Sequence, residues 1–326
     1  MPSEKRSIKN VLTFKNLKYL ITIIGPTGIG KTALSIKLAN LYNCSIISCD
    51  SRQFFKEMTI GTAVPSAEEL QVAEHYFIQN KSILDSYNVG DFEREAIETL
   101  DKLFKKKSVQ ILVGGSGLYV DALLYGLDNF PEASNEIRET LQEEYSKKGI
   151  QFLQEKLQTL DPGYYLHLEN TNAQTLKNPQ RLMRFVEVCL ASGKPYSAFI
   201  NQPKRKCNFT PIIIGLEAER EIMYDRINQR VNTMLRDGLE DEAKKLLPCK
   251  NLNALQTVGY RELFNYFEGQ TSREFAIEEI KKNTRRFAKR QITWFKRSDK
   301  AKWFSWNYDI KEINEYIDKT IEDEKV

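Results

Sequence analysis

The segment Gly25-Pro-Thr-Gly-Ile-Gly-Lys-Thr32 has the residue types and the spacing of a phosphate-binding loop. It matches the pattern G-x-x-x-x-G-K-[ST], follows an apolar run at residues 19–24, and precedes a helix-compatible segment at residues 33–41. In such a strand, loop and helix, backbone N–H groups turn toward an anion and the helix N-terminus adds partial positive charge. Lys31 would reach the outer phosphates and Thr32 would bind Mg²⁺. The loop therefore predicts a diphosphate or triphosphate ligand, without specifying the reaction.

A second candidate is Asp50, in the segment Ser48-Cys-Asp-Ser-Arg-Gln53 after an apolar run at residues 44–48. An acidic residue at the carboxyl end of a strand faces the crevice in which open α/β sheets bind ligands. There it could bind Mg²⁺ or act as a general base, although its position alone also suits a turn or helix cap. Ser51 and Gln53 add polar groups suited to the edge of a nucleic-acid base.

A glycine cluster, Gly114-Gly-Ser-Gly-Leu-Tyr119, follows a third apolar run at residues 109–113. Glycines at a strand end allow a close backbone approach, and Ser116 adds a hydroxyl. Glycine turns after strands are common, so the cluster alone is weak evidence. Because the loop, Asp50 and this cluster each follow a strand, we expect them at the same edge of one sheet.

Three further segments carry clustered positive charge. Arg226 and Arg230 are four residues apart on a predicted helix, near Arg220, and could clamp phosphate oxygens. They could equally form a solvated face paired with neighbouring acids. Residues 281–297 contain eight Lys or Arg and no acid, with interleaved aromatic residues, which is typical of a phosphate-backbone contact. Asn178-Pro-Gln-Arg-Leu-Met-Arg184 starts as a capped helix that could contact RNA.

The composition excludes several classes of protein. The chain of 326 residues is 41% hydrophobic and 28% charged, and it has no 18-residue apolar run, so we expect no membrane span. Five scattered cysteines without C-x-x-C spacing favour neither zinc nor disulfides and fit a reducing cytoplasm. Two histidines make histidine-based catalysis a poor candidate. A net charge of +4 is too small to prove a nucleic-acid partner, and the basic first 18 residues suggest a short tail.

The elements that must position these residues alternate strand and helix over the first 120 residues. This alternation predicts an α/β fold, with a phosphate-loop parallel sheet covered by helices on both faces. One helix is expected over residues 89–107, with Asp91 as its N-cap. Residues 121–204 resemble a helical insertion with helices at 134–148, 151–160 and 178–191. A strand at 210–215 then resumes the sheet, which makes the core discontinuous, over residues 1–120 and 205–326. Further helices are expected over residues 218–247, 255–267, 275–297 and 311–326.

Taken together, these segments resemble the tRNA dimethylallyltransferases, which prenylate the N6 amine of an adenosine next to the anticodon. The resemblance covers roughly residues 20 to 298, in family order. It rests on Gly25–Thr32, Ser48-Cys-Asp-Ser51, Ile60-Gly-Thr-Ala63 with Pro65, Val113-Gly-Gly-Ser-Gly-Leu-Tyr119, Asn178-Pro-Gln-Arg-Leu-Met-Arg184, Ser192-Gly-Lys-Pro195, Val258-Gly-Tyr260 and Lys289-Arg-Gln-Ile-Thr-Trp294.

The resemblance implies a role for each matching residue. Asp50 would accept a proton from N6, Lys31 would assist the departing diphosphate, and Thr32 would lie at Mg²⁺. Dimethylallyl diphosphate would bind through Gly25, Pro26, Thr27, Gly28, Ile29, Gly30, Lys31, Thr32, Arg226 and Arg230. The tRNA would contact Asp50, Ser51, Arg52, Gln53, Ser116, Arg138, Gln180, Arg181, Leu182, Met183, Arg184, Arg286, Lys289 and Arg290. The insertion would hold the anticodon stem. We also expect a cytoplasmic monomer.

The chain departs from the family pattern at a few places. Ser116 stands where the family often has Thr, which keeps the hydroxyl. Residues 167–177 differ from the short turn that commonly precedes the Asn178 segment. The cysteines of the C-terminal zinc finger of eukaryotic relatives are missing, so the chain is bacterial in type. Three alternatives remain open: prenylation of free AMP, ADP or ATP, a small-molecule kinase, and a nucleotide-dependent RNA-binding protein without catalysis.

Overall fold

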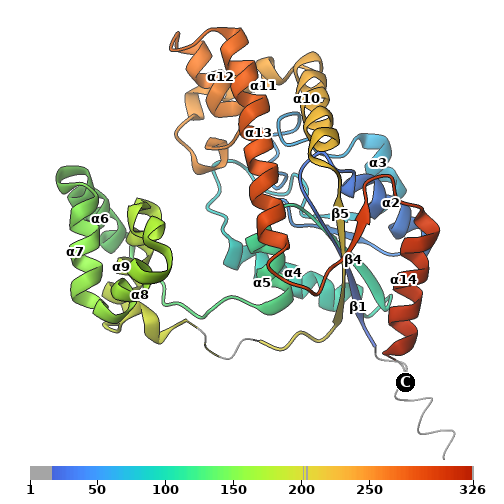
Figure 1. Cartoon of the computed structure of the whole chain (residues 1–326), viewed down its shortest axis with the longest axis horizontal. Helices are drawn as coiled ribbons and strands as arrows, with labels where there is room; N and C mark the ends of the chain where they lie inside the picture. Colours follow the sequence, from blue (N-terminus) through green and yellow to red (C-terminus); the bar gives the residue numbers. More distant parts are fainter. Residues whose placement is uncertain (1–16, 201, 203–204, 325–326) are drawn as a thin grey trace, which may run out of the picture. The chain divides into compact units, whose positions relative to one another are not determined.

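The computed structural model describes residues 17–200, 202 and 205–324. All but the last two residues of the predicted basic tail therefore lie outside the described residues. The chain divides into two compact units, one from residues 1–125 and 207–326 and the other from residues 126–206 (Figure 1). No helix in the described part of the chain is both long and apolar enough to cross a membrane.

The first unit is built around a six-stranded parallel sheet with the strand order β3-β2-β4-β1-β5-β6. This confirms the predicted parallel α/β fold. The strand after the helical segment, at residues 210–217, pairs with the strand at residues 19–24. The strands are β1 (Tyr19–Ile24), β2 (Ile46–Ser48), β3 (His75–Tyr76), β4 (Val109–Val113), β5 (Thr210–Glu217) and β6 (Lys302–Ser305).

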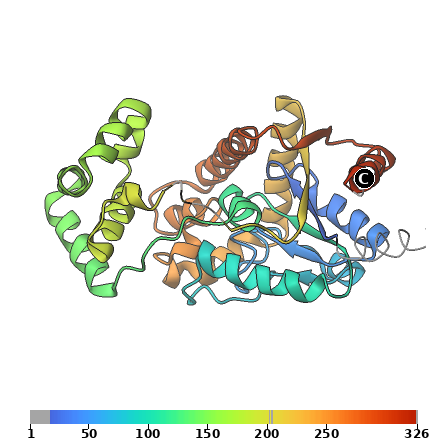
Figure 2. The same ribbon diagram turned by 90° about the horizontal axis from the view of Figure 1, so that it is seen from below.

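Helices cover both faces of this sheet, as predicted (Figure 2). Alternate residues of β1 point to opposite faces. Leu20 packs with residues of α4 (Val89–Leu103) and α5 (Gly117–Tyr125), whereas Ile21 packs with residues of α2 (Lys31–Tyr42) and α14 (Ile310–Asp323). Because both faces are covered, all six residues of β1 are buried, which explains its continuous apolar sequence.

Four helices extend the first unit beyond the sheet: α10 (Arg220–Arg236), α11 (Leu239–Leu246), α12 (Tyr260–Phe267) and α13 (Arg273–Phe295). Figure 1 shows α10 and α13 rising from the end of the sheet at which β5 leads into α10. The single helix predicted over residues 218–247 is wrong. The chain turns at Gly238, whose φ of 103° lies in the left-handed region that favours glycine, and α11 starts there.

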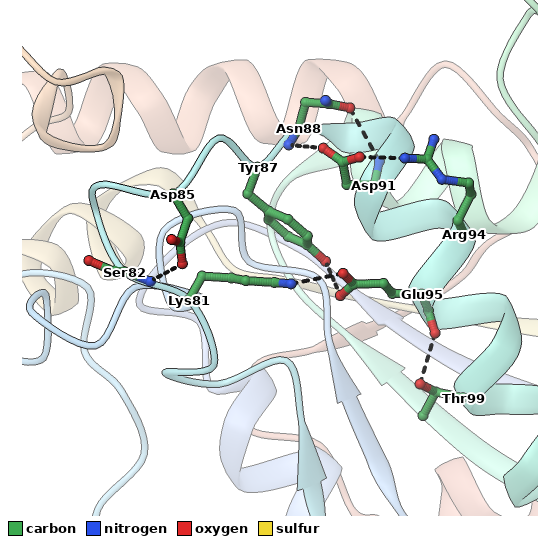
Figure 3. Close-up of polar contacts among 9 residues, drawn as sticks. All are labelled: Lys81, Ser82, Asp85, Tyr87, Asn88, Asp91, Arg94, Glu95 and Thr99. Atoms are coloured by element: carbon green, nitrogen blue, oxygen red, sulfur yellow. Dashed lines mark hydrogen bonds and ion pairs between the residues drawn. The ribbon is translucent and has the colours of Figure 1, made fainter.

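The start of α4 also differs from the prediction. Asn88, not Asp91, is the N-cap, and its side-chain oxygen accepts hydrogen bonds from N–H groups of the first turn. The Asp91 carboxylate reaches back to the Asn88 N–H at 2.9 Å, which completes a capping box. Glu95, one turn further on, binds Lys81 at 2.8 Å and the Tyr87 hydroxyl at 3.1 Å (Figure 3). These contacts fasten the preceding loop to α4.

The second unit is a helical bundle with its own apolar core. Its core includes Leu153, Leu157, Leu182 and Val186, all fully buried. The buried Asp161 carboxylate accepts hydrogen bonds at the start of one helix and from Ser197 N–H at 2.7 Å. The helices are α6 (Asn135–Lys148), α7 (Ile150–Leu160), α8 (Pro162–Asn172) and α9 (Pro179–Ser192), of which α8 was not predicted.

Candidate active site

The predicted phosphate loop connects β1 to α2. Its three glycines, Gly25, Gly28 and Gly30, have φ values of 146°, 78° and 109°, which only glycine adopts readily. A Cβ atom on Gly25 would lie 2.6 Å from the carbonyl oxygen of Leu216 on β5. The loop therefore needs glycine both for its backbone conformation and for its closeness to the neighbouring strand.

Lys31 lies within the curve of this loop. Its Nζ donates hydrogen bonds to the carbonyl oxygens of Gly25 at 3.0 Å and Pro26 at 2.8 Å. Burial lowers the pKa of Lys31 to about 8; the Asp50 carboxylate opposes this shift, whereas the positive charge of Arg230 adds to it. The ammonium group thus lies among the charged groups predicted to bind and activate the substrates.

Two arginines reach the loop from α10. Arg226 donates through Nε to the carbonyl oxygen of Gly28 at 3.0 Å, and its guanidinium lies 4.6 Å from the Trp306 ring centre. Burial lowers the pKa of Arg230, and the charge of Asp50 opposes this shift. Both line the same cavity as the phosphate loop, as the phosphate-clamp hypothesis requires. Arg220 is exposed and bonds the Tyr224 hydroxyl at 3.1 Å instead.

Asp50 and the phosphate loop line one cavity of about 460 Å³. The cavity brings together side chains from the ends of β1 and β2 and from α10 and α13. Its lining comprises Thr27, Gly28, Gly30, Lys31, Thr32, Ala33, Ser48, Asp50, Gln53, Glu69, Val113, Gly114, Arg226, Gln229, Arg230, Thr233, Phe287 and Gln291. An anionic group bound to the loop and a proton donor bound beside Asp50 would therefore lie next to each other in one cavity.

The oxygen atoms at this cavity suit a hard cation. Thr32, Ser48 and Asp50 offer two hydroxyl groups and a carboxylate, the kind of oxygen ligands that Mg²⁺ prefers. No group of three or more His, Cys, Asp or Glu within the described ranges could hold a metal by itself. A Mg²⁺ ion here would therefore need oxygens of a bound diphosphate or water as further ligands.

The polar residues around Asp50 brace its loop. Ser51 N–H donates to Ser116 Oγ at 3.1 Å, which joins the loop to the glycine turn after β4. Gln53 lines the cavity, while its Nε2 donates to the carbonyl oxygens of Thr62 at 3.2 Å and Ala63 at 3.0 Å. Of the predicted nucleic-acid contacts, Ser51 and Ser116 are therefore hydrogen-bonded to each other, and Gln53 is hydrogen-bonded to backbone carbonyl groups.

Arg52, a predicted tRNA contact, also holds backbone in place. Its Nη1 donates to the carbonyl oxygens of Asn253 at 2.8 Å and Ala254 at 3.0 Å. Burial lowers the pKa of this guanidinium. The backbone N–H of Arg52 donates to Asp50 Oδ1 at 3.0 Å. Arg52 therefore links Asp50 to the segment before α12.

The basic segment predicted over residues 281–297 lies in α13 and ends at the turn after it. Arg286, Lys289 and Arg290 are exposed, as a phosphate-backbone contact requires. Phe287 and Gln291, one turn apart, line the cavity instead. Gln291 was not among the predicted site residues, although it lies within the motif Lys289–Trp294, because nothing near it in the sequence indicates a partner on the phosphate loop.

The remaining predicted RNA contacts belong to the second unit. Arg138 on α6 and Arg184 on α9 both approach the Glu187 carboxylate, at 3.8 and 3.6 Å, so they form one charged group. Arg181 and Gln180 are exposed at the start of α9, and Met183 is half-buried. Leu182 is fully buried in the helical core, so its prediction as a tRNA contact does not fit this structure.

Comparison with known proteins identifies the relatives of this site. A sequence model of the IPP transferase family matches residues 53–298, well over half of the chain. The chain belongs to this family. It is 66% identical over 301 residues to the tRNA dimethylallyltransferase of Flavobacterium psychrophilum, an alignment that covers 92% of this chain and 98% of that one. The corresponding protein of Flavobacterium johnsoniae is 62% identical, with 92% and 97% coverage. The predicted family is thus confirmed.

Solved structures of IPP transferases have the same fold. The tRNA isopentenylpyrophosphate transferase of Bacillus halodurans matches with a TM-score of 0.69 and 35% identity, covering 94% of this chain and 98% of that one. A eukaryotic dimethylallyltransferase matches with a TM-score of 0.76 and 22% identity, over 93% of this chain and 77% of that one, which shows a shared fold. The phosphate loop and sheet therefore form an IPP transferase core.

Proposed function

We propose that this protein transfers a dimethylallyl group from dimethylallyl diphosphate to the N6 amine of the adenosine next to the anticodon in tRNA, releasing diphosphate. The observation that carries the proposal is the 66% identity to a tRNA dimethylallyltransferase over nearly the full length of both chains. The cavity lined by the phosphate loop and Asp50 also supports it, because a diphosphate and a proton acceptor would lie close together there.

In this proposal, the phosphate loop holds the diphosphate of the donor. Loop N–H groups, Lys31 and the guanidinium groups of Arg226 and Arg230 stabilise the negative charge that grows on the leaving group. Thr32 would bind Mg²⁺, with oxygens of the diphosphate as further ligands. When bound, the metal supplies additional neutralisation of that charge. A loop usually associated with ATP would thus hold a leaving group.

Asp50 activates the acceptor. An adenine N6 amine is a poor nucleophile, because its lone pair is delocalised into the ring. The Asp50 carboxylate accepts its proton while the new C–N bond forms and the allylic C–O bond to diphosphate breaks. A carboxylate is a weak base, so much of the rate must come from holding both substrates in line. The bonds of Ser51, Arg52 and Gln53 described above provide that fixed position.

The tRNA binds through positive charge on both units. Arg286, Lys289 and Arg290 on α13, and Arg138, Arg181 and Arg184 on the inserted unit together with the uncharged Gln180, contact the anticodon arm. Taking the target base out of its stack costs a few kcal/mol, roughly, and these backbone contacts offset that cost. The protein acts as a monomer in the cytoplasm, where its tRNA substrate is made.

The test is a reaction of the purified protein with tRNA, dimethylallyl diphosphate and Mg²⁺, followed by mass spectrometry of the nucleosides. N6-prenylated adenosine is the expected product, and its absence with folded protein would refute the proposal. AMP, ADP and ATP offered as acceptors test prenylation of free nucleotides. Consumption of ATP with unmodified tRNA would indicate a kinase, and tight tRNA binding without product would indicate a non-catalytic RNA-binding protein.

A further inference from the structure

Gln291 joins two loops of the active site that lie far apart in the sequence. Its Oε1 accepts a hydrogen bond from Thr27 N–H in the phosphate loop at 2.9 Å. Its Nε2 donates to the carbonyl oxygen of Gly115, in the glycine turn after β4, at 2.8 Å. The side chain is 6% exposed, so one buried amide fixes both backbones.

The absence of side chains at Gly115 and Gly117 leaves room for α13 to pack against the glycine turn. A Cβ atom on Gly115 would lie 2.2 Å from Gln291 Nε2, and one on Gly117 would lie 2.2 Å from Trp294 Cδ1. Trp294 also donates through its indole N–H to Asp121 Oδ2 at 2.9 Å. The two glycines therefore allow α13 to approach closely enough for Gln291 to reach both loops.

The same bond fixes the tip of the phosphate loop from a second direction. Arg226 on α10 holds the carbonyl oxygen of Gly28, and Gln291 on α13 holds the N–H of Thr27. A loop rich in glycine has many conformations available, so its shape depends on such contacts from outside. Without Gln291, the tip loses the hydrogen bond at Thr27 N–H and keeps the one from Arg226 at the Gly28 carbonyl oxygen.

Gln291 also connects the loop to the basic face of the same helix. Arg286, Lys289 and Arg290 are exposed on α13, whereas Gln291 is buried against the two loops. We propose that Gln291 is a positioning residue that sets the phosphate loop for the donor diphosphate and aligns it with the helix that binds tRNA. This inference rests on the proposed function, and it adds a residue that acts through the backbone of the loop rather than on substrate.

The test is the variant Gln291→Met in the full chain. Methionine keeps the length of the side chain and removes both hydrogen bonds. We expect inorganic diphosphate, titrated by calorimetry with Mg²⁺, to bind about tenfold more weakly, because the loop loses its preorganisation. We expect kcat to fall by roughly 10- to 100-fold, as small errors in substrate placement do. The affinity for tRNA stays within about twofold, since the exposed basic residues are unchanged.

Two further variants separate positioning from folding. Gln270→Met alters an exposed amide after α12 that bonds Glu268 at 3.2 Å, and we expect wild-type behaviour. Gln291→Glu keeps an acceptor for Thr27 but loses the donor to Gly115 and adds negative charge. We expect it to weaken diphosphate binding at least as much as methionine does.

Diphosphate binding by Gln291→Met within twofold of wild type would overturn the inference. So would parallel losses of tRNA and diphosphate affinity, because these would indicate general unfolding rather than a displaced loop. The calorimetric measurement needs no turnover. It therefore decides the role of Gln291 even if the wild-type protein prenylates no tRNA, the separate result that would refute the proposed function.

Discussion

Replacement of Glu242 by glutamine is expected to destabilise the first unit strongly. The Glu242 carboxylate on α11 accepts hydrogen bonds from the backbone N–H groups of Thr59, Ile60 and Gly61, at 3.0, 2.8 and 2.9 Å. It also accepts one from the Tyr260 hydroxyl at 2.6 Å. Tyr260 is fully buried, and the Glu242 carboxylate accepts four hydrogen bonds in all.

The magnitude follows from how these bonds divide between the two oxygens. One oxygen accepts from Thr59 and Ile60, and the other accepts from Gly61 and Tyr260. Glutamine replaces one oxygen by an NH₂ group, which cannot accept, so two bonds are lost and their donors face another donor. A hydrogen bond to a charged group contributes about 1.5–3 kcal/mol. Because the 59–61 loop is partly exposed, we expect a loss of roughly 3 kcal/mol, near the lower end of the sum for two bonds.

The assay is denaturant unfolding followed by tryptophan fluorescence. The three tryptophans, Trp294, Trp303 and Trp306, all belong to the first unit, so their signal reports that unit alone. The matched control is Glu240→Gln on the same helix, where the carboxylate forms an ion pair with Arg273 at the surface. Such a pair contributes about 0–1 kcal/mol. Equal losses for Glu242→Gln and Glu240→Gln would refute the reasoning.

The other predictions concern the chemistry of the site and the second unit. Asp50→Ala is expected to abolish turnover while tRNA binding, measured by filter retention, persists; unchanged turnover would remove Asp50 from its role. The Lys31 pKa of about 8 predicts that kcat/KM for the donor falls as pH rises through about 8, because the ammonium that attracts diphosphate loses its proton there. A flat profile between pH 7 and 9 would contradict this. Leu182→Ala should cost the second unit about 2–5 kcal/mol, seen as an earlier loss of helical circular dichroism, without shifting the tryptophan transition.

Residues whose roles depend on neighbours in the sequence could be predicted, and the others could not. The phosphate loop combines a buried strand, glycines and a helix start within some twenty residues, and the structure places it where predicted. The break between α10 and α11 depends on the conformation of Gly238, which helical periodicity does not reveal. The short edge strands β3 and β6 were missed because two and four residues show little periodicity.

Contacts between residues far apart in the sequence could not be predicted, for a different reason. Gln291 lies 264 residues from Thr27, and Glu242 lies 182 residues from Ile60. Nothing in the local pattern of an amide or carboxylate on a helix distinguishes a loop partner from solvent. Arg52 illustrates the same limit, since only the structure reveals its bonds to the backbone at Asn253 and Ala254.

Several polar side chains in and around the site bind the backbone of its loops. Gln53, Glu242 and Gln291 hold the backbone of loops through carbonyl and N–H groups, and these bonds leave the loops few other conformations. Asp50 and Arg230 add charge to the cavity, which Gln53 and Gln291 also line. A transition state with growing negative charge on diphosphate is stabilised best by groups that need not reorient when the charge appears. Loops fixed by distant side chains supply that rigidity, so replacing a side chain that holds a loop should lower kcat without altering any group that touches the substrates.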